Sequence, residues 1–155
     1  MNTNLKLLFK TGDDFAPMFL RFSAAIVMFP HGAQLLLGWF GGFGFENTMN
    51  YFTQQAGLPW IVGFMVILIQ FFGSLFILTG MATRLNAIAM LAIAIGMIFS
   101  GHVEHGFFMN WFGNQKGEGF EFHLLLIGIC AGLIFTGGGK LSFDRLWYQN
   151  LINNK

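Results

Sequence analysis

Four long apolar runs, separated by short polar or glycine-rich connections, dominate the pattern of the chain. They cover residues 15–37, 58–78, 81–101 and 120–135, and the last run is the shortest. A helix that crosses the hydrocarbon core of a bilayer needs about 20 mainly apolar residues. We therefore expect an all-α fold, an integral membrane four-helix bundle, with one membrane domain over residues 1–155.

The connection between the first two runs, residues 38–59, is rich in glycine and aromatic residues. Apolar side chains recur there at helical spacing, at Phe45, Met49, Phe52 and Ala56. This spacing predicts a short amphipathic helix in the outer membrane interface, with Asn47 as its expected N-cap. Residues 106–115 are similarly aromatic, and we expect the two connections to cover the outer end of the bundle.

The composition supports a membrane location. Of 155 residues, 55% are hydrophobic and 10% are charged, and the mean hydropathy is +0.62. Soluble domains carry about 25% charged residues, and a small domain has too much surface to hide such a shortfall. The single cysteine, Cys130, can form no internal disulfide, and we expect it to pack in the interior. The net charge of +1 gives no reason to expect nucleic acid as a partner.

Basic residues are unevenly divided between the two sides that four crossings define. Both termini share one side, which receives seven of the eight basic residues: Lys6, Lys10, Arg21, Arg84, Lys140, Arg145 and Lys155. The other side receives Lys116 and four acids, namely Glu46, Glu104, Glu118 and Glu121. Because cytoplasmic loops carry an excess of Lys and Arg, we expect both termini in the cytoplasm. The first run is then a retained helix and not a cleaved signal peptide.

This topology places ionisable residues from distant segments at similar depth near the outer face. They are His31 in the first run, His102 and His105 at the end of the third, and Glu118, Glu121 and His123 at the start of the fourth. His31 follows Pro30, whose ring frees a backbone carbonyl and kinks a helix. Gln34 lies one turn after His31, so both face the same side of that helix. We expect a polar pocket at this depth.

Six segments of the chain point to a known family. They read FPHGAQLLLGWFGGFG (residues 29–44), GLPW (57–60), QFFGSLFILTGMATR (70–84), HVEHGFFMNW (102–111), EGFEFHLLL (118–126) and GGGKLSFD (137–144). In order and spacing they resemble the DoxX family, small four-helix inner-membrane proteins of bacteria. One member is described as a subunit of a thiosulfate:quinone oxidoreductase, so the resemblance implies a quinone-linked redox role. Many relatives carry a glutamate where this chain has Gln70; a hydrogen-bonding role survives that change, but a proton-carrying role does not.

A quinone headgroup needs hydrogen-bond donors for its two carbonyls and a path for protons, and histidine supplies both near neutral pH. The candidate catalytic residues are His31, His102, His105 and Glu121. The candidate ligand-binding residues are Arg21, Gln34, Trp39, Gln70, Glu118 and His123. The sequence has no flavin, iron–sulfur or dithiol motif. Electrons would therefore come from a protein partner, and the chain would be a quinone-binding or membrane-anchoring subunit.

Other ligands stay open for the same residues. A metal site formed by His31, His102, His105 and a carboxylate is chemically possible, because imidazole and carboxylate suit Zn, Fe or Mn. The sequence has no HExxH motif and no Glu-x-x-His pair that would mark such a site. A single haem near the outer face is conceivable, although the histidines crowd at one end of the bundle. A small transporter ranks last, because four spans are few and no inverted repeat is evident.

Several residues also have plainer interpretations. Arg21 can extend to the cytoplasmic interface, or it can be buried against Gln70 or a backbone carbonyl. Trp39 can anchor the interface or stack on a quinone ring. A second class of function is a non-catalytic scaffold, in which the polar layer only orders the helix ends. Small residues would then mediate self-association or partner binding: Gly63, Gly73, Gly96 and Gly128.

Overall fold

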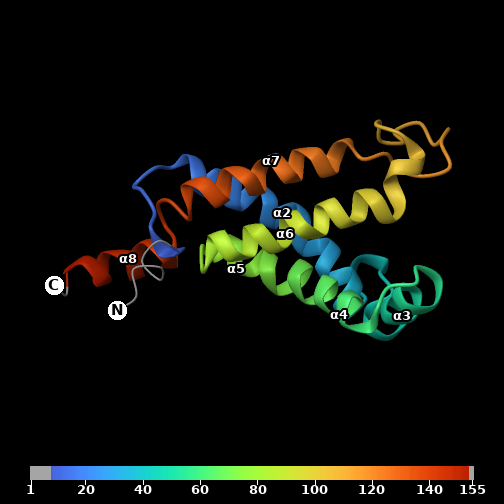
Figure 1. The fold of residues 1–155 in the computed structure, drawn as a ribbon, viewed down its shortest axis with the longest axis horizontal. Helices are drawn as coiled ribbons and strands as arrows, with labels where there is room; N and C mark the ends of the chain where they lie inside the picture. Colours follow the sequence, from blue (N-terminus) through green and yellow to red (C-terminus); the bar gives the residue numbers. More distant parts are fainter. Residues whose placement is uncertain (1–7, 154–155) are drawn as a thin grey trace.

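The computed structural model describes residues 8–153, and every regular element within that range is helical (Figure 1). The first long helix is α2 (Ala16–Leu37). The second, Trp60–Thr79, joins α4 (Trp60–Leu68), η3 (Ile69–Gly73) and α5 (Ser74–Thr79). The third, Thr83–His105, joins α6 (Thr83–Met97), η4 (Ile98–His102) and η5 (Val103–His105), and α7 spans Glu121–Thr136. These bounds confirm the all-α fold class and fall within a few residues of the predicted runs.

Within the described residues, three helices are long and apolar enough to cross a membrane: α2, Trp60–Thr79 and Thr83–His105. Helix α7 is also apolar but has 16 residues. In Figure 1 these helices lie roughly along the long axis of the molecule, with α6 packed beside α7 and α2 beside α5. The length and composition of the helices are those of a membrane protein.

Shorter elements complete the fold. A turn of 3-10 helix, η1 (Trp39–Gly41), follows α2, and then α3 (Gly44–Asn50) continues into η2 (Tyr51–Gln55). The expectation that Asn47 caps this helix is wrong. Gly44, with a φ of 71°, lets the chain enter α3 one turn earlier, and Asn47 Nδ2 donates to the carbonyl of Phe43 at 3.1 Å from inside the helix. Helix α8 (Phe143–Asn153) follows α7, and the sequence pattern did not predict it.

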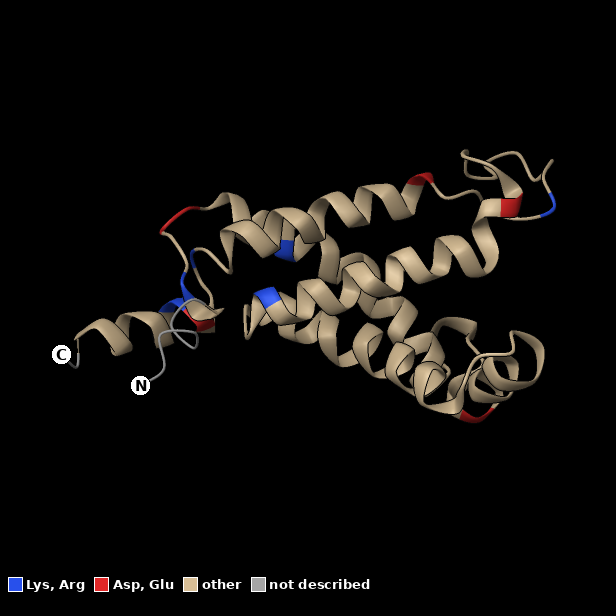
Figure 2. Cartoon of the chain, viewed as in Figure 1, with Lys and Arg blue, Asp and Glu red and all other residues tan. Residues whose placement is uncertain are grey.

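In Figure 2 most Lys and Arg residues lie in the half of the molecule that carries the termini, and acidic residues lie toward both ends of the long axis. The terminal end carries the first described residues and α8, and the distal end carries α3 and the connection of residues 106–120 (Figure 1). At the terminal end Arg84 bonds to the carbonyl of Lys10, Arg21 bonds to that of Lys140, and Arg145 pairs with Asp13. Lys116 belongs to the connection of residues 106–120 at the distal end. Lys6 and Lys155, which belong to the charge count of the sequence, lie outside the described residues.

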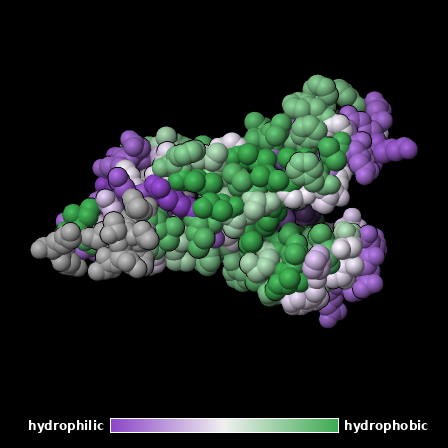
Figure 3. Space-filling model, in the orientation of Figure 1, coloured by the Kyte–Doolittle hydropathy of each residue, from purple (hydrophilic) through white to green (hydrophobic). Residues whose placement is uncertain are grey.

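The interior of the bundle is small, and many large apolar side chains are exposed. The buried cluster contains Ala24, Met28, Ile77, Ala87, Met90, Ala94, Leu126, Cys130 and Leu133. Cys130 is fully buried in this cluster, as expected. By contrast, Phe19 is 64% exposed and Leu125 is 69% exposed. Figure 3 shows a largely hydrophobic middle between two ends that carry the hydrophilic residues, and lipid is the natural solvent for such a surface.

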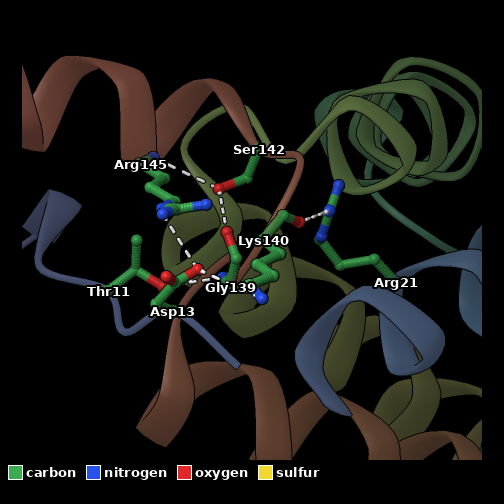
Figure 4. Close-up of polar contacts among 7 residues, drawn as sticks. All are labelled: Thr11, Asp13, Arg21, Gly139, Lys140, Ser142 and Arg145. Carbon is green, nitrogen blue, oxygen red and sulfur yellow. Dashed lines mark hydrogen bonds and ion pairs between the residues drawn. The ribbon is translucent and has the colours of Figure 1, made fainter. Parts of the chain in front are cut away.

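The terminal end is held together by a buried arginine. Arg21 of α2 has no exposed surface, and its Nε donates to the carbonyl of Gly138 at 2.8 Å. Its Nη1 donates to the carbonyl of Leu78 at 2.7 Å. Its Nη2 donates to the carbonyl of Lys140 at 2.9 Å (Figure 4) and to that of Leu141 at 3.0 Å. The guanidinium is therefore buried, and it ties the end of α5 to the segment that follows α7 through backbone carbonyls and not through Gln70.

A buried aspartate completes this arrangement from α8. Asp144 is 1% exposed, and its carboxylate accepts from the backbone amides of Ala82 at 2.7 Å and Thr83 at 2.8 Å, at the start of α6. Gly80 fits between Arg21 and Ser142, where a Cβ would meet both side chains. We name Arg21, Gly80, residues 138–142 and Asp144 the basal cluster. It satisfies backbone groups that helix ends otherwise leave without partners.

Candidate functional site

A cavity of about 620 Å³ lies toward the distal end, between α2, α4 and α6. The molecule divides there into two arms, one made by α6 and α7 and the other by α3 and α4, and Figure 3 shows a notch between them. The polar residues that line the cavity are His31, Gln34, Gln70 and Ser100, and most of the remaining lining is aliphatic. Ligand cavities commonly have about 300–1,000 Å³ and an apolar wall with a few polar groups.

A close approach of two backbones brings His31 and Gln70 to the same cavity. Gly32 is buried, and a Cβ at this position would lie 2.5 Å from the backbone nitrogen of Phe71 and 2.6 Å from the carbonyl carbon of Gln70. Helix α2 and η3 therefore touch at a point where only glycine fits. Pro30 lies within α2 beside this contact, as the sequence predicted, and His31 and Gln34 both line the cavity.

Three π-helical turns surround the cavity, and each contributes to its wall. Phe52 comes from η2, Gln70 from η3 and Ser100 from η4. A π-helical turn contains an extra residue, widens the helix locally and occurs often at functional sites. Gln70 is 5% exposed, and its Nε2 makes only a long contact of 4.0 Å with Sδ of Met97. Most of the hydrogen-bonding capacity of this amide therefore remains for a molecule in the cavity.

A second polar group lies at the distal ends of η4 and α7. The rings of His102 and His123 pack with their centroids 4.2 Å apart, and we name them the histidine pair. His102 Nδ1 lies 2.9 Å from the carbonyl oxygen of Glu118. His123 is 5% exposed, and its Nδ1 has no hydrogen-bond partner among the described residues. Neither histidine lines the cavity directly.

The carboxylates of Glu118 and Glu121 accept hydrogen bonds from the connection of residues 106–120. Glu118 Oε2 accepts from the backbone amide of Asn110 at 2.6 Å. Glu121 Oε1 accepts from the amide of Met109 at 3.1 Å and from Nε1 of Trp111 at 3.4 Å. Both side chains therefore point to residues 106–120, and neither lines the cavity.

The remaining candidates lie apart from the cavity. The His105 ring occupies the space where a Cβ of Gly117 would stand. Trp39 is 54% exposed and packs edge-on against Phe40, and Arg21 belongs to the basal cluster at the opposite end. The single predicted polar layer is thus divided. His31 and Gln34 line the cavity, whereas the other histidines and both carboxylates lie by the connection of residues 106–120. Within residues 8–153, no three His, Cys, Asp or Glu side chains come together in a way that could hold a metal ion.

Sequence reasoning missed the aliphatic wall and Ser100. The wall on α4 includes Ile61 and Met65, whose positions in a uniformly apolar run carry no distinguishing signal. A signal was present on the third helix, where small residues recur every three or four positions on one face: Ala89, Ala92, Gly96 and Ser100. Such a row permits close helix packing, and here it leaves space for the cavity.

Comparison with known proteins identifies the family. The model of the DoxX family matches residues 16–103, which is more than half of the chain. The chain belongs to the DoxX family. The resemblance seen in the sequence is thereby confirmed. The matched region extends from the start of α2 into η5, so the DoxX match contains every polar residue of the cavity lining, whereas α7 with His123 lies beyond it.

One curated relative matches almost the whole DoxX chain. It is named "Putative oxidoreductase CatD", from Bacillus subtilis (strain 168), and is 27% identical over 136 residues, which cover 88% of this chain and 90% of the relative. No solved structure matches the chain. The family model therefore establishes the family, and the name of this relative describes that protein as a putative oxidoreductase.

Proposed function

We propose that this DoxX protein crosses the bacterial inner membrane four times and binds a quinone headgroup in its cavity, as a subunit of a quinone-linked oxidoreductase. The observation that carries the proposal is the cavity itself. It combines an aliphatic wall with His31 and Gln70, two side chains that can donate hydrogen bonds from neighbouring helices. A quinone has the matching chemistry, with an apolar ring and two carbonyl acceptors.

The proposed topology has both termini in the cytoplasm, α7 as the fourth crossing and α3 with η2 in the outer interface. The charge separation of Figure 2 supports it, because basic residues gather at the terminal end and short cytoplasmic segments are enriched in Lys and Arg. The aromatic residues at the distal end agree with an interface, since Trp39 and Trp111 are both more than half exposed there. The cavity then opens within the outer leaflet.

A lipid-soluble quinone suits the walls of the cavity. Ile61 is 59% exposed and Met65 is 44% exposed on α4, and on the facing helix a Cβ at Gly96 would meet no atom within 4 Å. The wall is therefore open to the surrounding lipid, and a tail can remain in the bilayer while the headgroup enters. In the reaction, quinone takes up two electrons and two protons to give quinol. The electrons come from a partner protein that carries a flavin, an iron–sulfur cluster or a dithiol.

The test fills the cavity with a side chain. Gly96→Phe places a ring into the space between α4 and α6, and Gly128→Phe is the matched control, because Gly128 is also a helical glycine with no atom within 4 Å of an added Cβ. Binding of decylubiquinone to protein in nanodiscs is measured by equilibrium titration. We expect the wild type and Gly128→Phe to bind alike, and Gly96→Phe to bind at least about tenfold more weakly, which is about 1.4 kcal/mol. Equal binding by all three proteins, or no binding by the wild type, would overturn the proposal.

A non-catalytic scaffold is the second candidate. It is favoured by Glu118 and Glu121, whose carboxylates accept from backbone amides of the adjacent connection. Such a scaffold would use the aromatic distal surface to hold a protein partner or a second copy. His31→Ala separates the two functions: a redox subunit stays folded and keeps its partner but loses activity, whereas a scaffold keeps its partner and the activity of the complex.

A further inference from the structure

The turn that follows α2 contains a backbone conformation that large side chains rarely adopt. Phe40 lies within η1 and has a φ of 53° and a ψ of 31°, in the left-handed region, where a bulky residue is an outlier. Its ring is 65% exposed, so packing of the side chain does not account for the conformation. Such strain persists only where the surrounding structure holds it, and it gathers at ligand sites. The contacts of this turn therefore indicate what it does.

Gln34 of α2 holds the turn in place. Its Nε2 donates to the carbonyl oxygen of Phe40 at 3.2 Å. The turn is also folded back against the helix, because a Cβ at Gly42 would overlap the Cα and Cβ atoms of Gln34. The amide of Gly42 donates to the carbonyl of Trp39 at 2.9 Å, which closes the turn. We name residues 39–42 the positioning turn, since its strained carbonyl and the amide of Gln34 fix each other.

The same glutamine lines the cavity, one helical turn after His31. A carbonyl oxygen can only accept, so the amide nitrogen of Gln34 faces Phe40 and uses one of its two hydrogens there. The second hydrogen and Oε1 remain for another partner. Because the bond to Phe40 limits rotation of the amide, these two groups keep one orientation before a ligand arrives. Rigid placement of this kind lowers the entropy cost of binding.

We propose that Gln34 binds the quinone headgroup as a third hydrogen-bonding residue beside His31 and Gln70, a role that rests on the proposed quinone function, and that the Phe40 carbonyl orients it. The free N–H of Gln34 donates to a carbonyl oxygen of the quinone, and Oε1 accepts from a hydroxyl group of the quinol. The amide therefore serves both oxidation states, whereas an ionised carboxylate at this position offers no donor to the quinone. Phe40 does not touch the ligand; it is a positioning residue that acts through Gln34.

The first test changes the amide itself. Wild type, Gln34→Leu and Gln34→Glu in nanodiscs are titrated at neutral pH with decylubiquinone and, without oxygen, with decylubiquinol. We expect Gln34→Leu to bind both forms about five- to tenfold more weakly, the usual size of one lost hydrogen bond. Gln34→Glu should lose at least about fivefold more affinity for the quinone than for the quinol, because its carboxylate accepts but does not donate. A purely structural role would change both affinities alike, and their ratio does not depend on the fraction of folded protein.

The second test moves the positioning turn and leaves Gln34 unchanged. Gly42→Ala inserts a methyl group between the turn and α2 and breaks the bond from Gln34 to Phe40. We expect decylubiquinone to bind about three- to tenfold more weakly, because the ligand must then order a free amide. Phe40→Gly is the matched control. It keeps the carbonyl, and glycine adopts the left-handed conformation readily, so the affinity should stay within about twofold of the wild type.

The variants also separate the role of Gln34 from the quinone site as a whole. If Gln34→Leu binds decylubiquinone like the wild type while Gly96→Phe does not, or if Gln34→Glu keeps the wild-type ratio of affinities, the role of Gln34 is refuted and the quinone site stands. If Gln34→Leu binds weakly and Gly42→Ala binds like the wild type, orientation by Phe40 is refuted. If the wild type binds no decylubiquinone, both proposals fail.

Discussion

The two ends of this protein use polar side chains in opposite ways. At the terminal end, Arg21 and Asp144 are almost fully buried, and their hydrogen bonds go to backbone carbonyls and amides of the same chain. At the distal end, His31 and Gln70 face a cavity, and much of their hydrogen-bonding capacity is left over. The buried charges therefore have a structural role, whereas the proposed quinone site rests on spare hydrogen-bonding capacity beside a cavity.

Glycines show the same contrast. A Cβ at Gly80 or Gly138 would collide with the side chain of Ser142 in the basal cluster, whereas a Cβ at Gly96 would enter open space in the cavity. Glycine thus permits close packing at one end and leaves room at the other. The comparison predicts that substitutions at the terminal end change stability and that those at the distal end change binding or local order.

The largest expected effect is that of Arg21→Met, which keeps an unbranched side chain but leaves several buried carbonyls without a donor. Because each buried acceptor left without a partner costs about 1–3 kcal/mol, we expect the free energy of unfolding to fall by about 3–5 kcal/mol, measured by denaturing-detergent titration with tryptophan fluorescence. Arg145→Met is the control. It removes an ion pair with the exposed Asp13, 2.9 Å away, and should cost about 0–1 kcal/mol. Similar losses for both would contradict the comparison.

Gly80→Ala should have the next largest effect, because the position combines a φ of 70° with contacts to Ser142 and Arg21. Gly57→Ala isolates the backbone part, since Gly57 has a φ of 66° and an added Cβ there meets nothing within 4 Å. We expect Gly57→Ala to cost about 1–2 kcal/mol, and Gly80→Ala to cost a further 1–3 kcal/mol, roughly, from overpacking. If both variants lose the same free energy of unfolding in this titration, the basal cluster accommodates the added methyl group without strain.

Gly32→Ala should affect both stability and binding. The new methyl group would press on the backbone of η3 and move Gln70 away from His31. We expect a loss of about 1–3 kcal/mol together with weaker binding of decylubiquinone. Gly101→Ala is the control, because a Cβ at Gly101 meets no atom within 4 Å. Unchanged affinity in Gly32→Ala would mean that the contact between α2 and η3 does not set the cavity.

The smallest effect on global stability is expected for Glu118→Gln. The neutral amide weakens the bond to the backbone amide of Asn110, which is 2.6 Å away in the wild type. Hydrogen–deuterium exchange should become faster in peptides that cover residues 106–116, while the free energy of unfolding changes by less than about 0.5 kcal/mol. Glu46→Gln on α3 should leave the exchange of these peptides unchanged. Unaltered exchange in Glu118→Gln would remove its role in ordering the connection.

The sequence predicted the long helices well, because their signal is local. Run length and hydropathy located them, and Gly38 and Gly80, which follow α2 and α5 with positive φ, mark where two of them end. The spacing of His31 and Gln34 predicted that both would face one site, and both line the cavity. Nearest-neighbour geometry on one helix is information that the sequence contains directly.

Contacts between segments that are distant along the chain could not be predicted from the sequence. Arg21 bonds to carbonyls more than 50 residues away, and Asp144 of α8 reaches amides at the start of α6. A backbone partner has no sequence signature, so neither contact could be assigned from residue types. The same reason applies to Glu118, whose partner is a backbone amide of the folded connection.

The π-helical turns escaped the sequence for a different reason. A π turn differs from an α turn by one extra residue, and only a pattern of polar and apolar positions can reveal the shift. In Trp60–Thr79 nearly every residue is apolar, so no such pattern exists. For the same reason, the cavity that these turns surround could not be predicted from the sequence.

The π-helical turn at Ile69–Gly73 holds one residue more than an α-helical turn would. Deleting one residue there would rotate the helix on one side of the deletion by about 100° relative to the other side. The hydropathy of the helix would hardly change. A different set of side chains would then look into the hollow. A change of one residue inside this helix would thus alter the lining of the cavity, while the end that Arg21 holds together stays as it is.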